Sequence, residues 1–135
     1  MDVLTKEQRR KNMKAIRSKA TKDEVLLAKT LWRLGHRYRK NDKTVFGKPD
    51  LTFKRHKLAI FVDSEYFHGK DWDNEKYRIQ TNQDFWWAKI ESNMKRDKQV
   101  NNELVKTGWK VLRFWSKEIR NNLANCINKI EETLK

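Results

Sequence analysis

Residues 47–68 have the sequence GKPDLTFKRHKLAIFVDSEYFH, which predicts a β-hairpin. Two runs rich in β-forming residues, Leu51–Phe53 and Leu58–Val62, flank a short basic turn. Pro49 is the single proline of the chain, and it precedes the first run at a position where a sheet tolerates proline. The second run is apolar up to Val62 and then becomes acidic and aromatic, which favours a functional site at this edge of the sheet.

Carboxylates and a histidine stand at the open end of this hairpin. Asp50 begins the first strand, Asp63 and Glu65 follow the second strand, and His68 ends the segment. Hydrolysis of a phosphodiester needs a cation that neutralises developing charge and activates water. Mg²⁺ takes oxygen ligands and keeps several waters, so one or two carboxylates can hold it. His68 suits a base or acid near a phosphate because imidazole has an ordinary pKa of about 6.5; a surface or capping histidine is the open alternative.

The charge of the chain indicates a polyanionic partner. The 135 residues contain 32 Lys and Arg against 18 Asp and Glu, a net charge of +14. Such a balance favours nucleic acid as the partner. A membrane surface is disfavoured, because the N-terminal Met1-Asp2-Val3 carries no lipidation signal and no apolar run exceeds five residues. Cys126 is the single cysteine, which excludes an internal disulfide and fits a reducing cytoplasm, where we expect the protein to associate with the nucleoid.

The rest of the chain predicts a single α/β domain, residues 1–135, with a sheet between helices. The predicted elements are, in chain order, a helix from Thr21 to Gly35, a strand within 36–40, the hairpin, an irregular connection at 70–83, a helix at 84–106, a strand at 109–115 and a helix at 116–134. The strand at 109–115 is nearly all apolar, which predicts burial on both faces. The core candidates of the helix at 84–106 are Phe85, Ala88, Met94 and Leu104.

Two features of the N-terminal part have alternative interpretations. Residues 1–19 are strongly basic and form either a disordered tail or an arm that lies on DNA. Met13 and Ile16 favour the arm, because they stand one helical turn apart. Thr21 and Glu24 form a capping-box pattern at a helix start, so a cap is the simpler role for Glu24 on spacing alone.

Several short motifs, spread from about Arg10 to Trp115, together resemble the very short patch repair (Vsr) mismatch endonucleases. They are Lys11-Asn12-Met13-Lys14-Ala15-Ile16, the helix start Thr21–Glu24, Gly47-Lys48-Pro49-Asp50, Phe61-Val62-Asp63 with Tyr66-Phe67-His68, Phe85-Trp86 with Lys89-Ile90 and Asn93, Arg96-Asp97, and Gly108-Trp109-Lys110-Val111-Leu112 before Trp115. The resemblance implies the PD-(D/E)XK restriction-endonuclease-like fold, a three-layer α/β core whose mixed central sheet is flanked by helices. It also implies a Mg²⁺-dependent endonuclease that nicks duplex DNA, at mismatches in DNA repair.

The resemblance implies a role for each matching residue of the site. Asp50 would bind Mg²⁺ together with the backbone carbonyl of Val62, and His68 would be the catalytic base. Glu24 and Asp97 would complete the site from the two flanking helices.

The resemblance also implies how DNA is held. Tyr66, Phe67 and Trp86 would enter the base stack beside the cleavage site, a use that agrees with the general physics of wedging and stacking. The basic residues of the matching motifs that would contact DNA are Lys11, Lys14, Lys48 and Arg96. One catalytic set per chain implies a monomer, and no repair-protein partner is specified.

The chain departs from the family pattern in two places. Asp63 replaces the histidine usually found after the metal-facing carbonyl, and we include Asp63 in the catalytic set. The structural zinc of the family is expected to be absent, because its four ligand positions hold residues that cannot form a zinc site. These residues are Glu65, Lys70, Trp72 and Lys117, and we expect them to form an ion-paired cluster packed on the indole instead.

These departures leave three alternatives open. The chain could be a phage, homing or restriction-associated nuclease of the same fold without mismatch specificity. Its metal site could use Asp50 with Asp63 and Glu65. Finally, it could be a catalytically inactive DNA-binding module.

Overall fold

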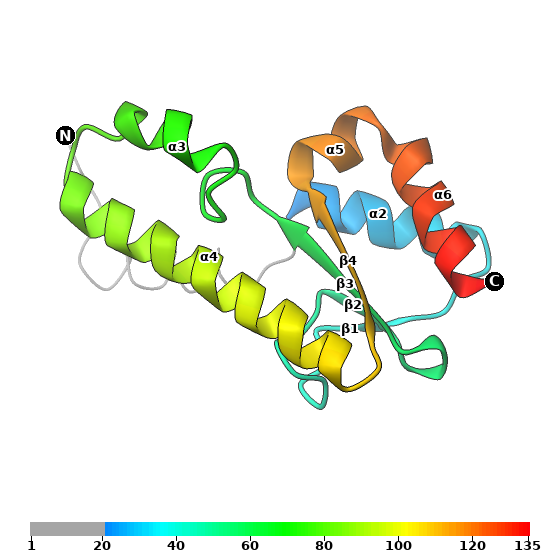
Figure 1. Cartoon of the computed structure of the whole chain (residues 1–135). Coiled ribbons are helices and arrows are strands. Elements are labelled where there is room, and N and C mark those ends of the chain that lie inside the picture. Colours follow the sequence, from blue (N-terminus) through cyan, green and yellow to red (C-terminus); the bar gives the residue numbers. More distant parts are fainter. Residues whose placement is uncertain (1–20) are drawn as a thin grey trace, which may run out of the picture.

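The computed structural model describes residues 21–135, and it has a four-stranded sheet between two layers of helices (Figure 1). Its elements are α2 (Lys22–Arg33), β1 (Arg39–Lys40), β2 (Leu51–Phe53), the 3₁₀ turn η1 (Lys54–His56), β3 (Leu58–Asp63), α3 (Trp72–Glu75), the 3₁₀ turn η2 (Lys76–Arg78), α4 (Gln83–Lys106), β4 (Lys110–Trp115), α5 (Ser116–Asn121) and α6 (Leu123–Leu134). The architecture confirms the predicted α/β class. The expected basic arm, with Lys11 and Lys14, lies outside the described residues.

The sheet is mixed and has the order β1-β2-β3-β4. Strands β2 and β3 pair antiparallel with Leu51 opposite Ile60, which confirms the predicted hairpin. Strands β3 and β4 pair parallel with Phe61 beside Arg113, and α4 lies on the connection between them. The start of β2 and the ends of β3 and β4 therefore lie at the same end of the sheet.

Two apolar clusters cover the two faces of the sheet. Leu58 and Ile60 of β3 pack among α2, α5 and α6, whereas Ala59 and Phe61 pack with residues of α4. Burial of each large aliphatic side chain stabilises the fold by about 1.5–3 kcal/mol. Because successive side chains of a strand point to opposite faces, Phe61 and Asp63 both lie on the face covered by α4. A slip of β3 by one residue would reverse this arrangement.

Helix α2 begins and ends where the sequence predicts. The Thr21 side chain accepts a hydrogen bond from the Glu24 N–H at 3.2 Å, which is the expected N-cap. Gly35 follows the helix with a φ of +92°, a conformation that favours glycine over residues with a Cβ atom. The cap fixes the first turn of α2, which carries the buried Glu24.

Three details of the other elements differ from the predictions. Phe85 and Ala88 are exposed, with Phe85 at 61%, because the first turns of α4 extend past the sheet (Figure 1). Strand β4 is mostly half-buried rather than buried on both faces, because it is an edge strand. The closing helix is interrupted at Asn122, whose φ and ψ of −136° and 47° are not helical. At the start of α5, Glu118 accepts the Trp115 N–H at 3.1 Å.

Among residues 21–135, no helix has both the length and the apolar composition that crossing a bilayer requires.

Candidate active site

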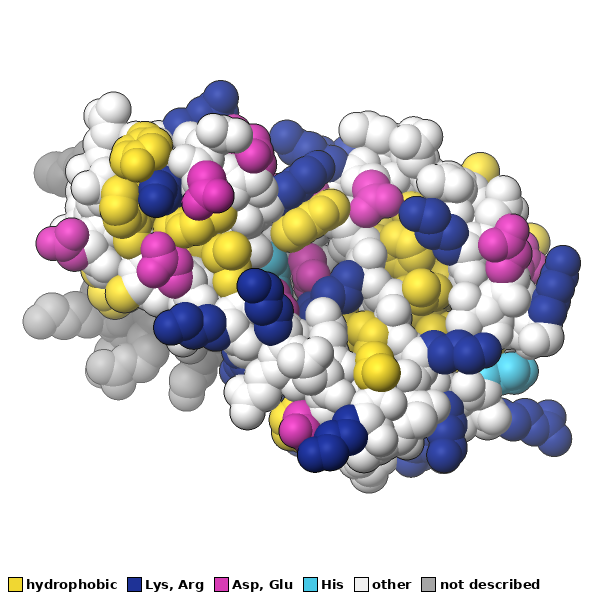
Figure 2. Space-filling view, in the orientation of Figure 1, with side chains coloured by type: hydrophobic (Ala, Val, Ile, Leu, Met, Phe, Trp, Pro, Cys, Tyr) yellow, Lys and Arg dark blue, Asp and Glu magenta, His cyan; other side chains and the backbone are white. Residues whose placement is uncertain are grey.

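A pocket of about 240 Å³ lies between the end of β3 and the middle of α4. It brings together five residues that the sequence predicts for the site: Asp50, Val62, Asp63, His68 and Asp97. The remaining lining residues are Gly47, Phe61, Asn93, Arg96, Val100 and Arg113. Figure 2 shows a depression near the centre of the molecule where a histidine lies beside acidic and basic side chains.

The turn before β2 holds Asp50 close to α4. Gly47 and Lys48 both have positive φ, at +79° and +50°, and this tight turn directs the chain into Pro49 and Asp50. A Cβ atom on Gly47 would overlap the side chain of Val100, so only glycine allows the turn to pack directly on the helix. Lys48 is exposed at the same turn.

The Asp50 carboxylate faces the end of β3. Its Oδ2 atom accepts a hydrogen bond from the Val62 N–H at 2.7 Å. Burial raises the pKa of Asp50 above its ordinary value, and the charge of Asp63 adds to this, while the Val62 hydrogen bond and the charges of His68 and Arg113 oppose it. The raised pKa means that the ionised carboxylate lacks full compensation.

Glu24 adds a second carboxylate from the opposite layer of helices. Burial raises the pKa of Glu24 to about 7, and the charge of Asp50 contributes in the same direction. The Thr21 cap and the charge of Lys40 lower this pKa without restoring the ordinary value. Two carboxylates that repel each other in a buried place are stabilised by a shared proton or by a cation.

The donor set of this edge fits a hard divalent cation. Asp50 and Val62 line the same pocket and offer a carboxylate and a backbone carbonyl. Glu24 lies close enough to Asp50 for the two negative charges to repel each other. Oxygen ligands of this kind are those that Mg²⁺ prefers. Asp63, His68 and Asp97 also have ligand atoms within 4.8 Å of one another. In this second group, however, His68 and Asp97 bind each other, and both oxygens of Asp63 bind Arg113.

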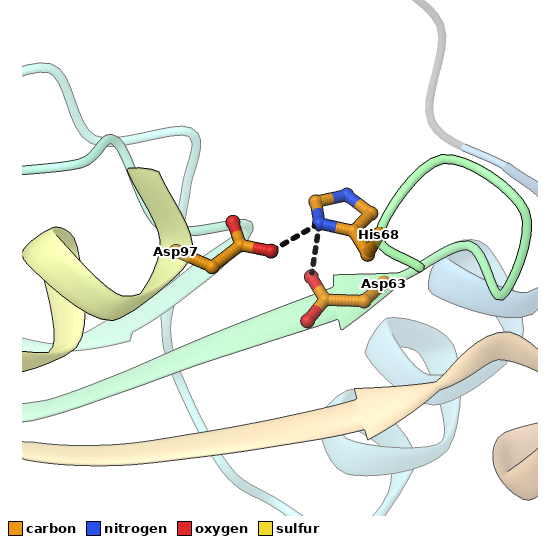
Figure 3. Close-up of side chains that lie close together, drawn as sticks. All are labelled: Asp63, His68 and Asp97. Atoms are coloured by element: carbon orange, nitrogen blue, oxygen red, sulfur yellow. Dashed lines mark hydrogen bonds and ion pairs between the residues drawn. The ribbon is translucent and has the colours of Figure 1, made fainter. Parts of the chain in front are cut away.

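His68 and Asp97 form a hydrogen-bonded pair (Figure 3). The His68 Nδ1 atom lies 2.6 Å from Asp97 Oδ2 and 3.8 Å from Asp63 Oδ1, while the second ring nitrogen points away from both carboxylates. Burial lowers the pKa of His68, but the hydrogen bond to Asp97 and the charges of Asp63 and Asp97 outweigh burial, so the pKa lies above its ordinary value. A carboxylate on Nδ1 favours the tautomer with a free Nε2, the form that accepts a proton.

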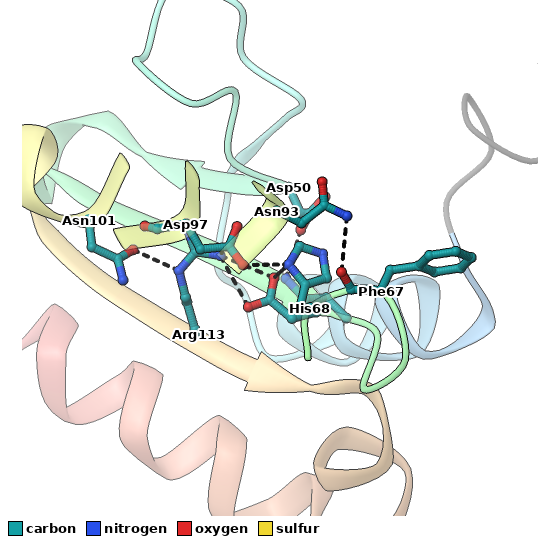
Figure 4. Close-up of polar contacts among 9 residues, drawn as sticks. Asp50, Phe67, His68, Asn93, Asp97, Asn101 and Arg113 are labelled. Atoms are coloured by element: carbon teal, nitrogen blue, oxygen red, sulfur yellow. Dashed lines mark hydrogen bonds and ion pairs between the residues drawn. The ribbon is translucent and has the colours of Figure 1, made fainter. Parts of the chain in front are cut away.

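Asp63 and Asp97 share one cation, the guanidinium of Arg113. Figure 4 shows Arg113 between Asp97 and Asn101. Arg113 Nη1 lies 3.1 Å from both Asp63 carboxylate oxygens and 3.6 Å from Asp97 Oδ1. Its Nε donates to Asn101 Oδ1 at 2.7 Å. We call Asp63, His68, Asp97, Asn101 and Arg113 the polar network.

The polar network bears on the alternative metal site made of Asp50, Asp63 and Glu65. Both oxygens of Asp63 are engaged by Arg113. Glu65 does not line the pocket; its carboxylate accepts the Lys117 N–H at 2.7 Å, at the start of α5. Glu65 therefore lies outside the pocket that holds Asp50. The structure does not bring together the three carboxylates that this alternative requires.

A cluster of aromatic rings lies beside the pocket. The ring centroids of Tyr66, Phe67 and Trp86 are 5.1–6.4 Å apart, and Phe85 adds a contact with Trp86 at 5.3 Å. Tyr66 and Phe67 are 48% and 45% exposed. The Asn93 side chain donates to the Phe67 carbonyl at 3.0 Å, which ties this loop to α4 while the Phe67 ring points away from the pocket (Figure 4).

The four positions of the family's zinc ligands also come together. Glu65, Lys70, Trp72 and Lys117 line a cavity of about 550 Å³, which we call the hollow. The expected ion-paired cluster is wrong: among residues 21–135 these side chains make no ion pair with one another. Glu65 binds a backbone N–H, and the Trp72 indole donates to Glu91 at 3.1 Å. Trp72 also packs edge-on against Trp87.

Sequence analysis did not assign a role to Arg113 or Asn101. The signal for Arg113 was present, since it is the one charge inside an otherwise apolar segment from Val111 to Trp115. A buried charge requires a partner. Nothing local indicated that the partners of Arg113 stand 50 and 16 residues earlier in the chain.

Comparisons with known proteins agree with this geometry. Residues 1–74 match the family model described as DNA mismatch endonuclease Vsr. The chain is 60% identical over 135 residues to a type II nicking enzyme of Haemophilus parainfluenzae, covering 99% of this chain and 96% of that protein. It is 50% identical to a type II nicking enzyme of Neisseria meningitidis serogroup C, covering 100% and 91%. It is 32% identical to the DNA mismatch endonuclease Vsr of Escherichia coli, covering 88% and 76%. The chain belongs to the Vsr family. The resemblance drawn from its motifs is thereby confirmed, and with it the endonuclease class.

Proposed function

We propose that this protein is a Mg²⁺-dependent endonuclease that nicks one strand of duplex DNA and acts as a monomeric single domain. The observation that carries the proposal is the pocket that joins Asp50 to the His68–Asp97 pair. The net charge of +14 supports a DNA substrate, because Lys and Arg contacts to phosphates dominate such binding. The printed names of the relatives, nicking enzymes and a mismatch endonuclease, support the same activity.

The residues of the pocket have separate tasks in this proposal. Asp50 and the Val62 carbonyl hold the cation, and Glu24 adds negative charge near it; the bound cation supplies charge neutralisation at the phosphate. His68 Nε2 takes a proton from the attacking water, while Asp97 holds the imidazole by Nδ1. The water oxygen forms the new bond to phosphorus, the P–O bond to the leaving oxygen breaks, and that oxygen takes up a proton.

Nicking of supercoiled plasmid tests the proposal. The wild-type protein converts it to the open circle in Mg²⁺ and does not do so in EDTA. Asp50→Ala removes this activity and leaves DNA affinity in a gel-shift assay nearly unchanged. Asp73→Ala, at an exposed position of α3, is the matched control and retains both.

Two outcomes would contradict the proposal. Nicking by Asp50→Ala at the wild-type rate would remove Asp50 from the site. DNA binding without nicking by the wild-type protein, on both matched and mismatched plasmids, would indicate the catalytically inactive DNA-binding module.

We further infer that the aromatic cluster enters the base stack at a mismatch. Tyr66 and Phe67 are exposed and supported from behind by Trp86, which suits side chains that unstack a base step. Arg96, exposed at the pocket, and Lys48, exposed at the turn before Pro49, suit contacts to the neighbouring phosphates.

Fluorescence of 2-aminopurine placed beside the cleavage site tests the wedge. The signal rises when the wild-type protein binds and stays flat with Phe67→Ala. An unchanged signal with both proteins would count against intercalation. Equal nicking of duplexes with and without a T:G mismatch would identify instead a nuclease without mismatch specificity.

A further inference from the structure

Arg113 has no role in the residue assignments above, yet it has the most connected side chain in the polar network. It extends from β4 toward α4, and its guanidinium lies 4.0 Å from the ring centroid of Phe61. Its nitrogens contact Asp63 on β3 and both Asp97 and Asn101 on α4. The side chain of Arg113 is 17% exposed and that of Asp63 is 8% exposed, so this contact is largely removed from water.

The geometry shows a competition for the imidazole of His68. Its Nδ1 atom has two carboxylates within reach, Asp97 at 2.6 Å and Asp63 at 3.8 Å. Asp63 receives Arg113 Nη1 on both of its oxygens, whereas the Asp97 oxygen that meets His68 is not the one nearest Arg113. The guanidinium thus satisfies Asp63 and leaves Asp97 Oδ2 for the histidine.

We propose that Arg113 is a positioning residue for His68: by engaging both oxygens of Asp63, it directs Nδ1 to Asp97 and aims Nε2 at the pocket. Without Arg113, Asp63 becomes a buried carboxylate whose nearest cationic partner is the imidazole. The ring then turns toward Asp63, and Nε2 leaves the direction in which it accepts a proton. The Asp63–Arg113 pair is thus how this chain accommodates an aspartate where its family usually has a histidine.

Single-turnover cleavage under saturating enzyme tests this inference, which rests on the proposed nicking activity. Arg113→Met slows cleavage by about 10²-fold, the order expected when a reacting group is misplaced by about 1 Å, and leaves the DNA Kd within about twofold. Arg113→Lys keeps the positive charge but cannot donate to both oxygens of Asp63 in the planar guanidinium geometry. Its cleavage rate therefore lies between those of the wild type and Arg113→Met. The double variant Asp63→Asn/Arg113→Met cleaves faster than Arg113→Met, because the competing carboxylate is gone.

The control is a second Arg–Asp fork outside the site. Arg120 binds Asp23 at 2.9 Å between α5 and α2, and Arg120→Met keeps cleavage within about twofold. The rate constant is measured at a temperature where urea unfolding shows each variant to be folded, so that lost stability does not lower it. Under this condition a purely structural role of Arg113 would leave Arg113→Met at the wild-type rate, and this result would overturn the inference, as would a double variant no faster than Arg113→Met or a loss confined to DNA affinity. Absence of nicking by the wild-type protein would instead reject the proposed function.

Discussion

The polar network and the hollow hold the positions at which the motif resemblance predicts ligands that this chain lacks, and the two regions differ in how the residues present are paired. In the polar network, an aspartate at the usual histidine position is matched by an arginine on the adjacent strand. In the hollow, Lys70 and Lys117 are exposed and make no ion pair with Glu65 in the described part of the chain. Burial accounts for the difference, because a buried charge must be paired whereas water already stabilises an exposed one.

The largest effect that this comparison predicts is on stability. Arg113→Leu leaves Asp63 buried without its cation, and breaking such a pair costs about 3–5 kcal/mol. Lys70→Leu, in the hollow, changes the free energy of unfolding by no more than about 0.5 kcal/mol. Urea unfolding of both variants measures the contrast. Equal costs for the two substitutions would mean that burial does not distinguish the two regions.

A smaller effect concerns pH and the carboxylates beside the polar network. The pKa of Glu24 is raised from about 4.5 to about 7 in the folded state, so between these values the folded protein binds more protons than the unfolded one. Stability without metal is therefore highest below pH 4.5 with respect to this group and falls as pH rises to about 7. The raised pKa values of Asp50, Asp63 and His68 act in the same direction.

The melting temperature in EDTA, measured from pH 4.5 to 8, checks this dependence. Glu24→Gln flattens the decline, because the amide does not titrate. Mg²⁺ raises the melting temperature of the wild-type protein more at pH 8 than at pH 5, where the carboxylates hold protons. The same dependence of melting temperature on pH for both proteins would show that the pKa of Glu24 is not raised in the folded state.

In the hollow, the aromatic side chain is expected to matter more than the charges. Trp72 is half-buried, packs edge-on at 6.3 Å from Trp87 and donates to Glu91. We expect Trp72→Ala to lower the free energy of unfolding by about 1–3 kcal/mol, whereas Lys117→Ala stays within about 0.5 kcal/mol. Chemical denaturation of the two variants measures both. A larger loss for Lys117→Ala would show that the hollow depends on charge.

The local elements of the fold could be predicted because they depend on neighbours in sequence. The hairpin of β2 and β3, the Thr21 cap and the turn at Gly35 each involve residues within a few positions, and each is confirmed. Phe85 was misassigned because a helical period marks an apolar face without showing where the sheet beneath it ends. The first turns of α4 lie beyond the sheet (Figure 1), and Phe85 is exposed there.

The candidate site could be predicted as a set of positions but not as a set of contacts. The motifs placed Asp50, His68 and Asp97 in one site, and the structure brings all three to one pocket. Their partners depend on the parallel pairing of β3 with β4, which joins residues 50 positions apart. The same limit explains the error about Glu65, whose partner Lys117 is 52 positions away and offers a backbone group rather than its charge.

The smallest expected effect concerns this contact. Glu65 accepts the N–H of Lys117 in the first turn of α5, where a helix has N–H groups without intrahelical partners. Glu65→Ala removes that acceptor and costs about 1 kcal/mol, within the range for loss of an N-terminal cap, while Glu65→Gln keeps an acceptor oxygen and costs less.

Because the carboxylate is engaged in this way, and neither the lysines nor the indole of the hollow suits Zn²⁺, elemental analysis of the purified protein finds no stoichiometric zinc. Differential scanning calorimetry of the two variants measures the tie between the hairpin exit and α5. Bound zinc, or a loss with Glu65→Gln as large as with Glu65→Ala, would show that the hollow is held by charge or metal and that its contrast with the polar network does not hold.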